Sequence, residues 1–440
     1  MRLGGRLEGA ISVLADIDAR KRPVADALKD WGLAHRFAGS GDRAAIGNIV
    51  YDALRMRLSH AWLMDDDSAQ AIAHAVMFRQ WGFTPDSLAT ELADDKFAPA
   101  PLSAEAVSAF ESRSLDDAPP HIRGDIPEWV QSSFEQAFGA DWLAEAQALA
   151  ARPTLDLRAN SLKASRDKVV KTLDRVGAHA ARIARYGIRI AAGEGASRLP
   201  NVTAELSFQK GWFEVQDEGS QIVADLVLAS DGEQVLDYCA GGGGKTLAMA
   251  AAMQNKGQVH AYDADRKRLA PIIERLKRAG TRNVQVHDDA RALSGLAGRC
   301  DKVLVDAPCT GTGTWRRRPD TKWRLTAKNL DERTAQQQDA LTQASGFVKS
   351  GGELIYVTCS VLPQENEEQV RRFTADNPDF QIVSALPAWD QLFGKDTPSP
   401  HSSDGLTVTL TPASTDTDGF FFCRMPVSYT HLTLPTNREV

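Results

Sequence analysis

The sequence predicts an α/β protein whose C-terminal part is a mostly parallel sheet with helices on its faces. Strand-like and helix-like segments alternate across residues 213–426, which is the pattern of consecutive βα units. Two of the strands also end alike, because the apolar run Val303–Val305 leads to Cys309 and the run Leu354–Val357 leads to Cys359. Ligands of such sheets bind beyond the carboxyl ends of the strands. Both thiols are therefore predicted to lie at the functional edge of the sheet.

The bulk composition is that of a globular protein with two or three domains. Of its 440 residues, 43% are apolar and 25% are charged. Five cysteines over this length do not resemble a disulfide framework, and Met1–Arg20 contain no continuous apolar segment. We therefore expect no signal peptide, no membrane partner and a reducing, cytoplasmic location. The formal charge of −7 weakly disfavours a nucleic-acid partner, although local basic patches decide this point.

Residues 1–84 are predicted to form an all-helical domain. Apolar residues recur there at intervals of three and four, and Gly39–Asp42 has the composition of a break followed by a helix start. Residues 85–126 are rich in proline, aspartate and serine. They are interpreted as a linker with one short helix at Ala104–Phe110.

Residues 127–212 are predicted to form a linking helix and a small α/β module. The helix covers Pro127–Leu149, and its aromatic side chains are interpreted as core. Arg158, Asn160 and Lys163 could contact RNA, although the sequence alone does not show it. The module has expected strands at Thr154–Arg158, Tyr186–Ala192 and Leu206–Val215 and one expected helix at Asp167–Val176.

The sheet domain, residues 213–426, is predicted to contain parallel strands and a closing antiparallel hairpin. The parallel strands are expected at Gln234–Tyr238, Gln258–Tyr262, Asn283–His287, Lys302–Asp306 and Glu353–Thr358. Helices are expected between them, at Leu247–Met253, Arg266–Ala279, Leu330–Val348 and Glu365–Ala375. The hairpin strands follow with no helix between them, at Leu406–Leu410 and Gly419–Arg424. Residues 427–440 extend no predicted element and are interpreted as a tail foreign to the native protein.

A glycine cluster after the first of these strands predicts a ligand-binding turn. Gly241–Gly244 follow Cys239 and Ala240 and precede Lys245. A nucleotide P-loop, a dinucleotide fold and an S-adenosyl-L-methionine site compete as interpretations. The P-loop pattern needs a glycine where this chain has Cys239, and the glycine spacing of the dinucleotide fold is not matched. We therefore favour S-adenosyl-L-methionine.

Two acids at the ends of successive strand regions support this cofactor. Asp263 closes the second strand, where a carboxylate binds ribose hydroxyls, and Asp289 follows the third and is expected near the adenine. The predicted cofactor-binding residues are thus Cys239, Ala240, Gly241, Gly242, Gly243, Gly244, Lys245, Asp263, Asp289 and Asp306.

The two cysteine-bearing stretches resemble motifs of the Sun-type RNA cytosine-C5 methyltransferases. Asp306–Gly313, followed by Arg317–Asp320, resembles the fourth motif of that family. Thr358–Ser360, followed by Glu365–Glu367, resembles the sixth. The resemblance is specific, because two strand-end cysteines with these flanks are rare together.

The resemblance covers roughly Pro153–Met425. Leu236–Thr246 resembles the first motif of the family, with Gly241–Gly242 where the family usually has Ala-Pro, a departure that keeps the turn. Residues 1–84 resemble, more loosely, a NusB-like RNA-binding domain. The implied architecture is a Rossmann-like class I methyltransferase sheet, preceded by a small α/β RNA-binding module and an all-α NusB-like domain.

The resemblance implies that a methyl group passes from S-adenosyl-L-methionine to carbon 5 of a cytosine in RNA, with 16S rRNA as the expected substrate. Carbon 5 becomes nucleophilic when a thiolate adds to carbon 6. By the resemblance, Cys359 supplies this thiolate and Cys309 assists release of the product. Asp306 is expected to hydrogen-bond the edge of the cytosine, and Lys245 to support the thiolate or orient the base.

Several alternatives stay open. The substrate could be a tRNA, or the chain could be a non-catalytic RNA-binding assembly factor. Cys309 could be the nucleophile instead of Cys359, as in DNA cytosine methyltransferases. The basic patch Arg316–Arg324 is either a solvated face or a phosphate clamp. No Cys-x-x-Cys pair indicates zinc, so no metal is expected, and the chain is expected to be a monomer. The candidate RNA-binding residues are Arg317, Arg318 and Lys322.

Overall fold

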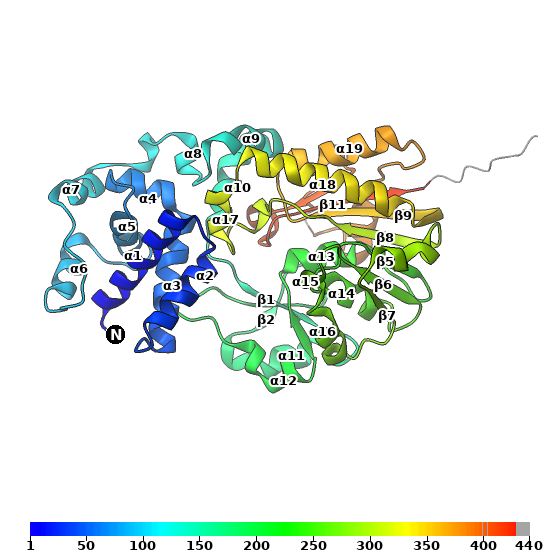
Figure 1. Ribbon diagram of the computed structural model, residues 1–440, viewed down its shortest axis with the longest axis horizontal. Coiled ribbons are helices and arrows are strands. Elements are labelled where there is room, and N and C mark those ends of the chain that lie inside the picture. The colour runs from blue at the N-terminus through cyan, green and yellow to red at the C-terminus, as the bar shows by residue number, and fades with distance from the viewer. Residues whose placement is uncertain (398, 403, 428–440) are drawn as a thin grey trace, which may run out of the picture.

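The computed structural model describes residues 1–397, 399–402 and 404–427. Figure 1 shows a group of helices at the N-terminal end, a small sheet module and a larger sheet with helices on both faces. The predicted foreign tail lies outside the described residues except for Val427, which follows the end of the last strand at Pro426. Its N–H donates to the Gly352 carbonyl at 2.9 Å, and it forms an isolated bridge with Phe380.

The N-terminal region is helical, as predicted. Gly39 precedes the third helix, and the Asp42 carboxylate accepts a hydrogen bond from the Gly39 N–H at 3.1 Å. Leu7, Ile46 and Ile49 are fully buried in the core. The helices are α1 (Leu3–Arg20), α2 (Val24–Ala34), α3 (Ser40–Arg55), α4 (Arg57–Met64) and α5 (Ala69–Arg79).

The segment 85–126 is part of this helical domain rather than a linker. Leu88 and Ala106 are buried in the same core as Leu7. Side chains of Thr84 and Ser103 cap two of its helices, which is a start signal that its proline and aspartate content obscured. Its elements are α6 (Pro85–Leu92), α7 (Ala104–Ser112), η1 (Leu115–Asp117) and α8 (Pro120–Arg123).

The predicted helix Pro127–Leu149 is broken in the middle. Gly139 has φ 54°, a left-handed conformation that ends the first half of the helix. Phe134 is buried and stacks on Trp315 at 5.9 Å, whereas Trp129 is 39% exposed and is not core. The pieces are η2 (Glu128–Val130), α9 (Gln131–Phe138), η3 (Gly139–Asp141) and α10 (Trp142–Leu149).

The small module is a four-stranded antiparallel sheet in the order β2-β3-β1-β4. The prediction of a strand over Leu206–Val215 is wrong in its first half, which is a helix that ends before Gly211 at φ 74°. The elements are β1 (Leu155–Ala159), α11 (Arg166–Thr172), η4 (Asp174–Val176), β2 (His179–Ala180), β3 (Gly187–Ile190), η5 (Val202–Ala204), α12 (Leu206–Gln209) and β4 (Phe213–Val215).

The large sheet has the strand order β10-β11-β9-β8-β5-β6-β7. Strands β5 to β9 are parallel, and β11 is antiparallel to both β9 and β10, as predicted. Val303 and Val305 pack on one face of the sheet and Leu304 on the other, so both faces are buried. The strands are β5 (Gln234–Asp237), β6 (Gln258–Tyr262), β7 (Val284–His287), β8 (Cys300–Asp306), β9 (Val348–Thr358), β10 (Val408–Leu410) and β11 (Phe420–Pro426).

The helices of this domain differ from the prediction at five places. The predicted helix Arg266–Ala279 is split at Pro271, the hairpin contains the short helix α21, and α13, α17 and α20 were not predicted. The helices are α13 (Glu218–Asp225), α14 (Gly244–Ala252), α15 (Arg266–Leu269), α16 (Ile272–Ala279), η6 (Ala290–Leu296), η7 (Thr312–Thr314), α17 (Pro319–Arg324), α18 (Ala327–Ser345), η8 (Pro363–Glu365), α19 (Glu367–Asp376), α20 (Leu386–Phe393) and α21 (Pro412–Thr415). Among the described residues, no helix has the length and apolar composition of a membrane span.

The segment that follows Cys309 joins the sheet domain to the helical domain. Lys322 on α17 donates from Nζ to the Arg55 carbonyl at 2.9 Å, and Trp323 donates from Nε1 to the Leu54 carbonyl at 2.6 Å. Arg55 in turn donates from Nε to the Arg316 carbonyl at 2.7 Å. The N-terminal domain is therefore held against the segment that follows Cys309.

The buried ammonium of Lys322 predicts a dependence of stability on pH. Burial lowers the pKa of Lys322 to about 8, with Asp125 opposing and Arg55 adding to this shift. Above pH 8 Lys322 loses its proton in the folded chain, whereas in the unfolded chain it keeps the proton up to the ordinary lysine pKa of about 10.4. The free energy of unfolding therefore increases as the pH rises between these two pKa values. Relative to Lys322→Met, the wild type should gain roughly 2 kcal/mol in free energy of unfolding between pH 8 and pH 10. Denaturant titration measures this difference.

The control for this prediction is Lys328→Met, because Lys328 has an 84% exposed side chain. The difference in free energy of unfolding between Lys328→Met and the wild type should not change from pH 8 to pH 10. A difference between wild type and Lys322→Met that is constant from pH 8 to pH 10 would contradict the shifted titration.

Candidate active site

The two strand-end thiols meet beyond the sheet. Cys309 follows β8 and Cys359 follows β9, and these neighbouring strands are in register, with Asp306 opposite Val357. The two sulfur atoms lie 3.3 Å apart, and both side chains are partly buried. A single ring placed beside one thiol would therefore also lie beside the other.

Glu365 holds the Cys309 loop against the Cys359 strand. Its side chain is fully buried and accepts a hydrogen bond from the Thr310 N–H at 2.8 Å and one from the Gln337 amide at 2.9 Å. The Gly313 N–H donates to the Cys359 carbonyl at 3.0 Å. Sequence reasoning noted Glu365 only as part of a motif and missed Gln337. No local pattern could reveal this role, because the bonded groups are far apart in sequence.

Gly313 allows a third segment to close on the two loops. Its carbonyl accepts a hydrogen bond from the Gly419 N–H at 2.7 Å, just before β11. A Cβ atom on Gly313 would lie 2.3 Å from the Gly419 carbonyl oxygen, which no side chain tolerates. The segments after β8 and β9 that carry the thiols are thus fixed by backbone contacts rather than by side-chain packing alone.

The Cys309 thiol is affected by its neighbour and by burial. The hydrogen bond to Cys359, and then burial, raise the pKa of the Cys309 thiol well above its usual range, and the charge of Glu365 acts in the same direction. Either thiol can donate its S–H to the sulfur of the other.

Asp306 and Lys245 form an ion pair beside the thiols. The Lys245 Nζ donates to an Asp306 carboxylate oxygen at 2.7 Å, and it lies 5.1 Å from the centre of the Phe420 ring. The Lys245 side chain is 7% exposed, whereas that of Asp306 is 30% exposed. Lys245 belongs to the first turn of α14, so this pair connects the glycine turn to the Cys309 loop.

The glycine turn packs closely against α16. Gly241 has φ 50° and Gly243 has φ 81°, conformations that favour glycine. A Cβ atom on Gly243 would lie 2.4 Å from the Ile272 side chain. The Arg275 guanidinium donates to the Gly242 carbonyl at 2.6 Å and fixes the turn.

A cavity of about 810 Å³ connects the end of β6 to the two thiols. This is the size range of cofactor sites. Predicted site residues in its lining are Cys239, Asp263, Asp306, Cys309, Arg318 and Cys359. The other predicted cofactor residues, Ala240, Gly241–Gly244, Lys245 and Asp289, are not part of the lining. Asp263 and Asp306, which both line this cavity, would hold an S-adenosyl-L-methionine cofactor bound there.

Asp263 and Asp289 differ in what surrounds them. Asp263 is 4% exposed, and its carboxylate accepts hydrogen bonds from the Gly241 N–H at 2.9 Å and the Asp265 N–H at 2.8 Å. Asp289 instead pairs with the Arg291 guanidinium at 2.6 Å, and this hydrogen bond lowers the pKa of its carboxyl. Asp263 lines the cavity and Asp289 does not.

Asp263→Ala should weaken binding of S-adenosyl-homocysteine by roughly 10- to 150-fold, because one charge-assisted hydrogen bond contributes about 1.5–3 kcal/mol. Asp263→Asn keeps an acceptor for the Gly241 N–H and should lose less. Asp289→Ala is the matched control and should bind within a few-fold of the wild type. Calorimetry measures all three affinities. Equal affinity for Asp263→Ala and the wild type would remove Asp263 from the site.

Two of the three predicted RNA-binding cations are engaged inside the protein. Arg317 donates to Asp217 at 2.7 Å, and Lys322 is 1% exposed and bonded to the Arg55 carbonyl. The prediction that they clamp RNA is therefore corrected: the basic patch is largely a joint between domains. Arg318 is exposed and lines the cavity, so it alone keeps its candidate role.

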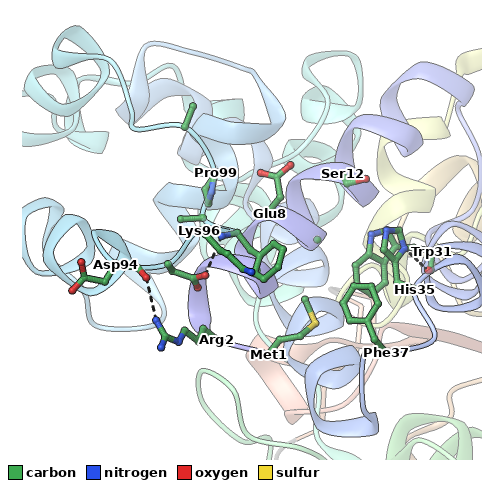
Figure 2. Close-up of a pocket in the computed structure, with 16 residues that line it drawn as sticks. Met1, Arg2, Glu8, Ser12, Trp31, His35, Phe37, Asp94, Lys96 and Pro99 are labelled. Carbon is green, nitrogen blue, oxygen red and sulfur yellow. Dashed lines mark hydrogen bonds between the residues drawn. The ribbon is translucent and has the colours of Figure 1, made fainter.

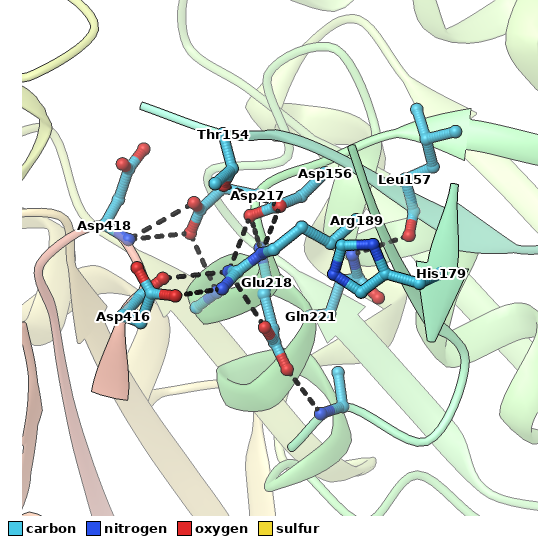
Figure 3. A network of polar contacts seen from close by, with 12 residues as sticks. Thr154, Asp156, Leu157, His179, Arg189, Asp217, Glu218, Gln221, Asp416 and Asp418 are labelled. Carbon is cyan, nitrogen blue, oxygen red and sulfur yellow. Dashed lines mark hydrogen bonds and ion pairs between the residues drawn. The ribbon is translucent and has the colours of Figure 1, made fainter. Parts of the chain in front are cut away.

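Arg317 belongs to a buried charge network that links the small module to the catalytic loops. Asp217 and Asp418 accept hydrogen bonds from Arg317, and Asp156 of β1 pairs with Arg189 at 2.9 Å. Figure 3 shows Asp156, Arg189, Asp217 and Asp418 gathered in one cluster. Asp418 directly precedes Gly419, so this network supports the contact with Gly313.

Two residues of the small module that could contact RNA are likewise structural. Arg158 is 6% exposed and donates to the Gly244 carbonyl at 2.8 Å. Asn160 donates to the carbonyls of Gly211 at 2.9 Å and Ala279 at 2.8 Å. Lys163 remains exposed. The module is thus fixed against the glycine turn and α16.

A separate cavity of about 1110 Å³ lies in the helical domain. Trp31 stacks on His35 at 4.2 Å between ring centres, and Phe37 meets the His35 ring edge-on at 5.8 Å (Figure 2). No predicted site residue lines this cavity. Within the ranges that the structure describes, no group of three His, Cys, Asp or Glu side chains could hold a metal ion.

Comparison with known proteins places this geometry in a family. Residues 225–426 match the model of the 16S rRNA methyltransferases RsmB/F, and residues 126–194 match the ferredoxin-like domain of RsmF/B-like methyltransferases. The Ribosomal RNA small subunit methyltransferase B of Cronobacter sakazakii is 34% identical over 303 residues, 68% of this chain and 66% of that protein. The chain belongs to the RsmB/F family. A Yersinia pseudotuberculosis protein of the same name is 33% identical over 68% of this chain and 66% of its own length.

Solved structures show the same fold. The crystal structure of PH0851 superposes with a TM-score of 0.72 and 22% identity over 97% of this chain and 99% of that one. A methyltransferase homologue from Pyrococcus horikoshii gives a TM-score of 0.58 and 26% identity, over 72% of this chain and 100% of that one. NSun6 from the same organism, solved with SFG, gives a TM-score of 0.59 and 20% identity, over 68% of this chain and 98% of that one.

RsmB/F membership confirms the predicted family and fold class. The chain spans slightly less than two thirds of the length of the two curated relatives, 66% in each case. The activity, substrate and partners of the whole protein are therefore proposals.

Proposed function

We propose that this protein methylates carbon 5 of a cytosine in 16S rRNA through a covalent bond between Cys359 and carbon 6. The observation that carries the proposal is the pair of sulfur atoms 3.3 Å apart. Asp306, which is paired with Lys245, lines the same cavity. The RsmB/F relatives support ribosomal RNA as the substrate.

Cys359 begins the reaction when its thiolate adds to carbon 6 of the cytosine. The sulfur–carbon bond forms, and the electrons of the carbon 5–carbon 6 double bond become available at carbon 5. Asp306, held by Lys245, hydrogen-bonds the edge of the base. S-adenosyl-L-methionine supplies the methyl group as an electrophilic sulfonium. The base must leave any helix before the thiol can reach it.

Cys309 acts at the end of the reaction. Water takes the proton from carbon 5, the electron pair of that carbon–hydrogen bond re-forms the double bond, and the sulfur of Cys359 departs with the electron pair of the sulfur–carbon bond. Cys309 is in contact with that sulfur, so its thiol can stabilise the departing thiolate. This order gives the two thiols different tasks at one ring.

Transfer of tritiated methyl groups to unmodified RNA tests the proposal. The wild type should label 16S rRNA, and nuclease digestion should return the label as 5-methylcytidine. If only tRNA were labelled, the substrate would be tRNA and not rRNA. If no RNA were labelled, a non-catalytic RNA-binding factor would be favoured over an enzyme. Bisulfite sequencing of rRNA and tRNA from a strain that lacks the protein identifies the modified cytosine.

A further inference from the structure

A basic groove lies where the small module meets the sheet domain. It has a volume of about 720 Å³ and runs between α12 and α16, which lie side by side in Figure 1. The Arg278 guanidinium lies 4.2 Å from the centre of the Phe208 ring across this junction. The groove is lined by Lys163, Thr203, Phe208, Gln209, Lys210, Glu274, Lys277 and Arg278. Four of these side chains are cations and one is an acid.

The positive charge of this basic groove is not neutralised by its neighbours. In the described part of the chain, Lys163, Lys210 and Lys277 have no ion pair, and all three are exposed. Arg275 and Arg278 share one carboxylate, that of Glu214, at 3.1 and 2.6 Å. Two cations on one buried acid leave a net positive charge at the surface.

The charge continues from the groove toward the active site. The segment 266–282 has basic residues at seven positions and an acid only at Glu274, although the whole chain carries −7. At its start, the exposed Arg268 lines the cavity that holds the two cysteines. At its end, α16 buries Ile272 and Ala279 and turns Lys277 outward. Packing explains the apolar side of α16 but not its cations.

We propose that the basic groove binds the phosphate backbone of the substrate RNA and holds it in line with the catalytic cavity. Exposed cations in the groove and at the edge of the catalytic cavity fit a linear polyanion. The Phe208 and Trp212 rings, which lie beside cations, add to this match, because aromatic side chains accept unstacked bases. The inference rests on the proposed function, since it supplies the RNA with a path to Cys359.

The test removes three charges from the groove without touching the site. The triple variant Lys163→Gln, Lys210→Gln, Lys277→Gln is compared with Arg299→Gln, Arg372→Gln, Lys395→Gln, which removes three exposed cations elsewhere in the sheet domain. Filter binding measures the affinity for a 16S rRNA fragment from 50 to 200 mM salt. Each phosphate contact contributes about 0.7–0.9 to the salt slope. The affinity ratio of wild type to groove variant should therefore be roughly 20- to 40-fold larger at 50 mM than at 200 mM.

The control triple should keep the salt slope of the wild type, and both triples should keep its melting temperature and affinity for S-adenosyl-homocysteine. Equal salt slopes for the groove variant and the control would overturn the proposal. If the groove variant lost affinity for poly-aspartate but kept the wild-type affinity for RNA, the proposal would also be overturned, because the partner would then be an acidic protein segment. Wild-type protein that binds RNA with this salt slope but never methylates it would instead contradict the proposed function.

Discussion

Cys309→Ala should trap the protein on its RNA. In the proposed order the Cys359 thiolate attacks and the methyl group is transferred before Cys309 is needed. Without the second thiol, which lies 3.3 Å from the first, the sulfur–carbon bond has no neighbouring group to assist its breakage. After incubation with RNA and S-adenosyl-L-methionine, a denaturing gel should show a slow band that contains methylated RNA. Turnover should fall by several orders of magnitude, while a single methyl transfer persists.

The matched variant is Cys359→Ala, which should neither methylate RNA nor form the slow band. Both substitutions remove one sulfur from a partly buried position, so a general loss of folding would affect them alike. Melting temperatures within a few degrees of the wild type exclude that explanation. The opposite pattern, an adduct in Cys359→Ala and none in Cys309→Ala, would exchange the roles of the two thiols.

Asp306→Asn should lower kcat by about 10²- to 10⁴-fold, the contribution that a positioned acid–base group commonly makes. The substitution keeps the size of the side chain but removes the charge that Lys245 contacts at 2.7 Å. The amide would present a donor as well as an acceptor to the base, so the pairing of the cytosine edge would change. Single-turnover methylation with saturating RNA and cofactor measures this effect.

Lys245→Met is the companion variant, because it removes the cation and leaves the carboxylate. It should also lower kcat, and its effect should not add fully to that of Asp306→Asn, since the two residues form one ion pair. The double variant should be little slower than the slower single variant. Fully additive losses would contradict a shared role, and an unchanged kcat in Asp306→Asn would remove that residue from the chemistry.

Sequence patterns predicted the sheet domain well because its elements are determined locally. Gln258–Tyr262 has the same bounds in the structure as in the prediction, since a short strand-like segment between turn residues specifies a buried strand. Cys309 and Cys359 could be assigned to one edge because parallel strands end at the same side of a sheet. Their contact distance could not be predicted, because it depends on Glu365, Gln337 and Gly419.

The failures concern residues whose role depends on distant partners. Leu88 looks isolated among prolines and acids, yet it is buried in the helical core. Lys322 lies in a basic run that is typical of a surface, yet it is buried against α3. The basic groove combines Lys163, Lys210 and Lys277 from three separate segments. No local sequence pattern marks such a site before the chain is folded.

Peptide mass spectrometry of an adduct with RNA that contains 5-fluorocytosine tests the central claim most directly. Fluorine cannot leave carbon 5 as a proton does, so the sulfur–carbon bond persists in the wild type. Trypsin places Cys359 in the peptide from Ser350 to Arg371 and Cys309 in the peptide from Val303 to Arg316. The account predicts that the nucleotide remains on the first peptide, at Cys359. A nucleotide found only on the second peptide, at Cys309, would contradict it.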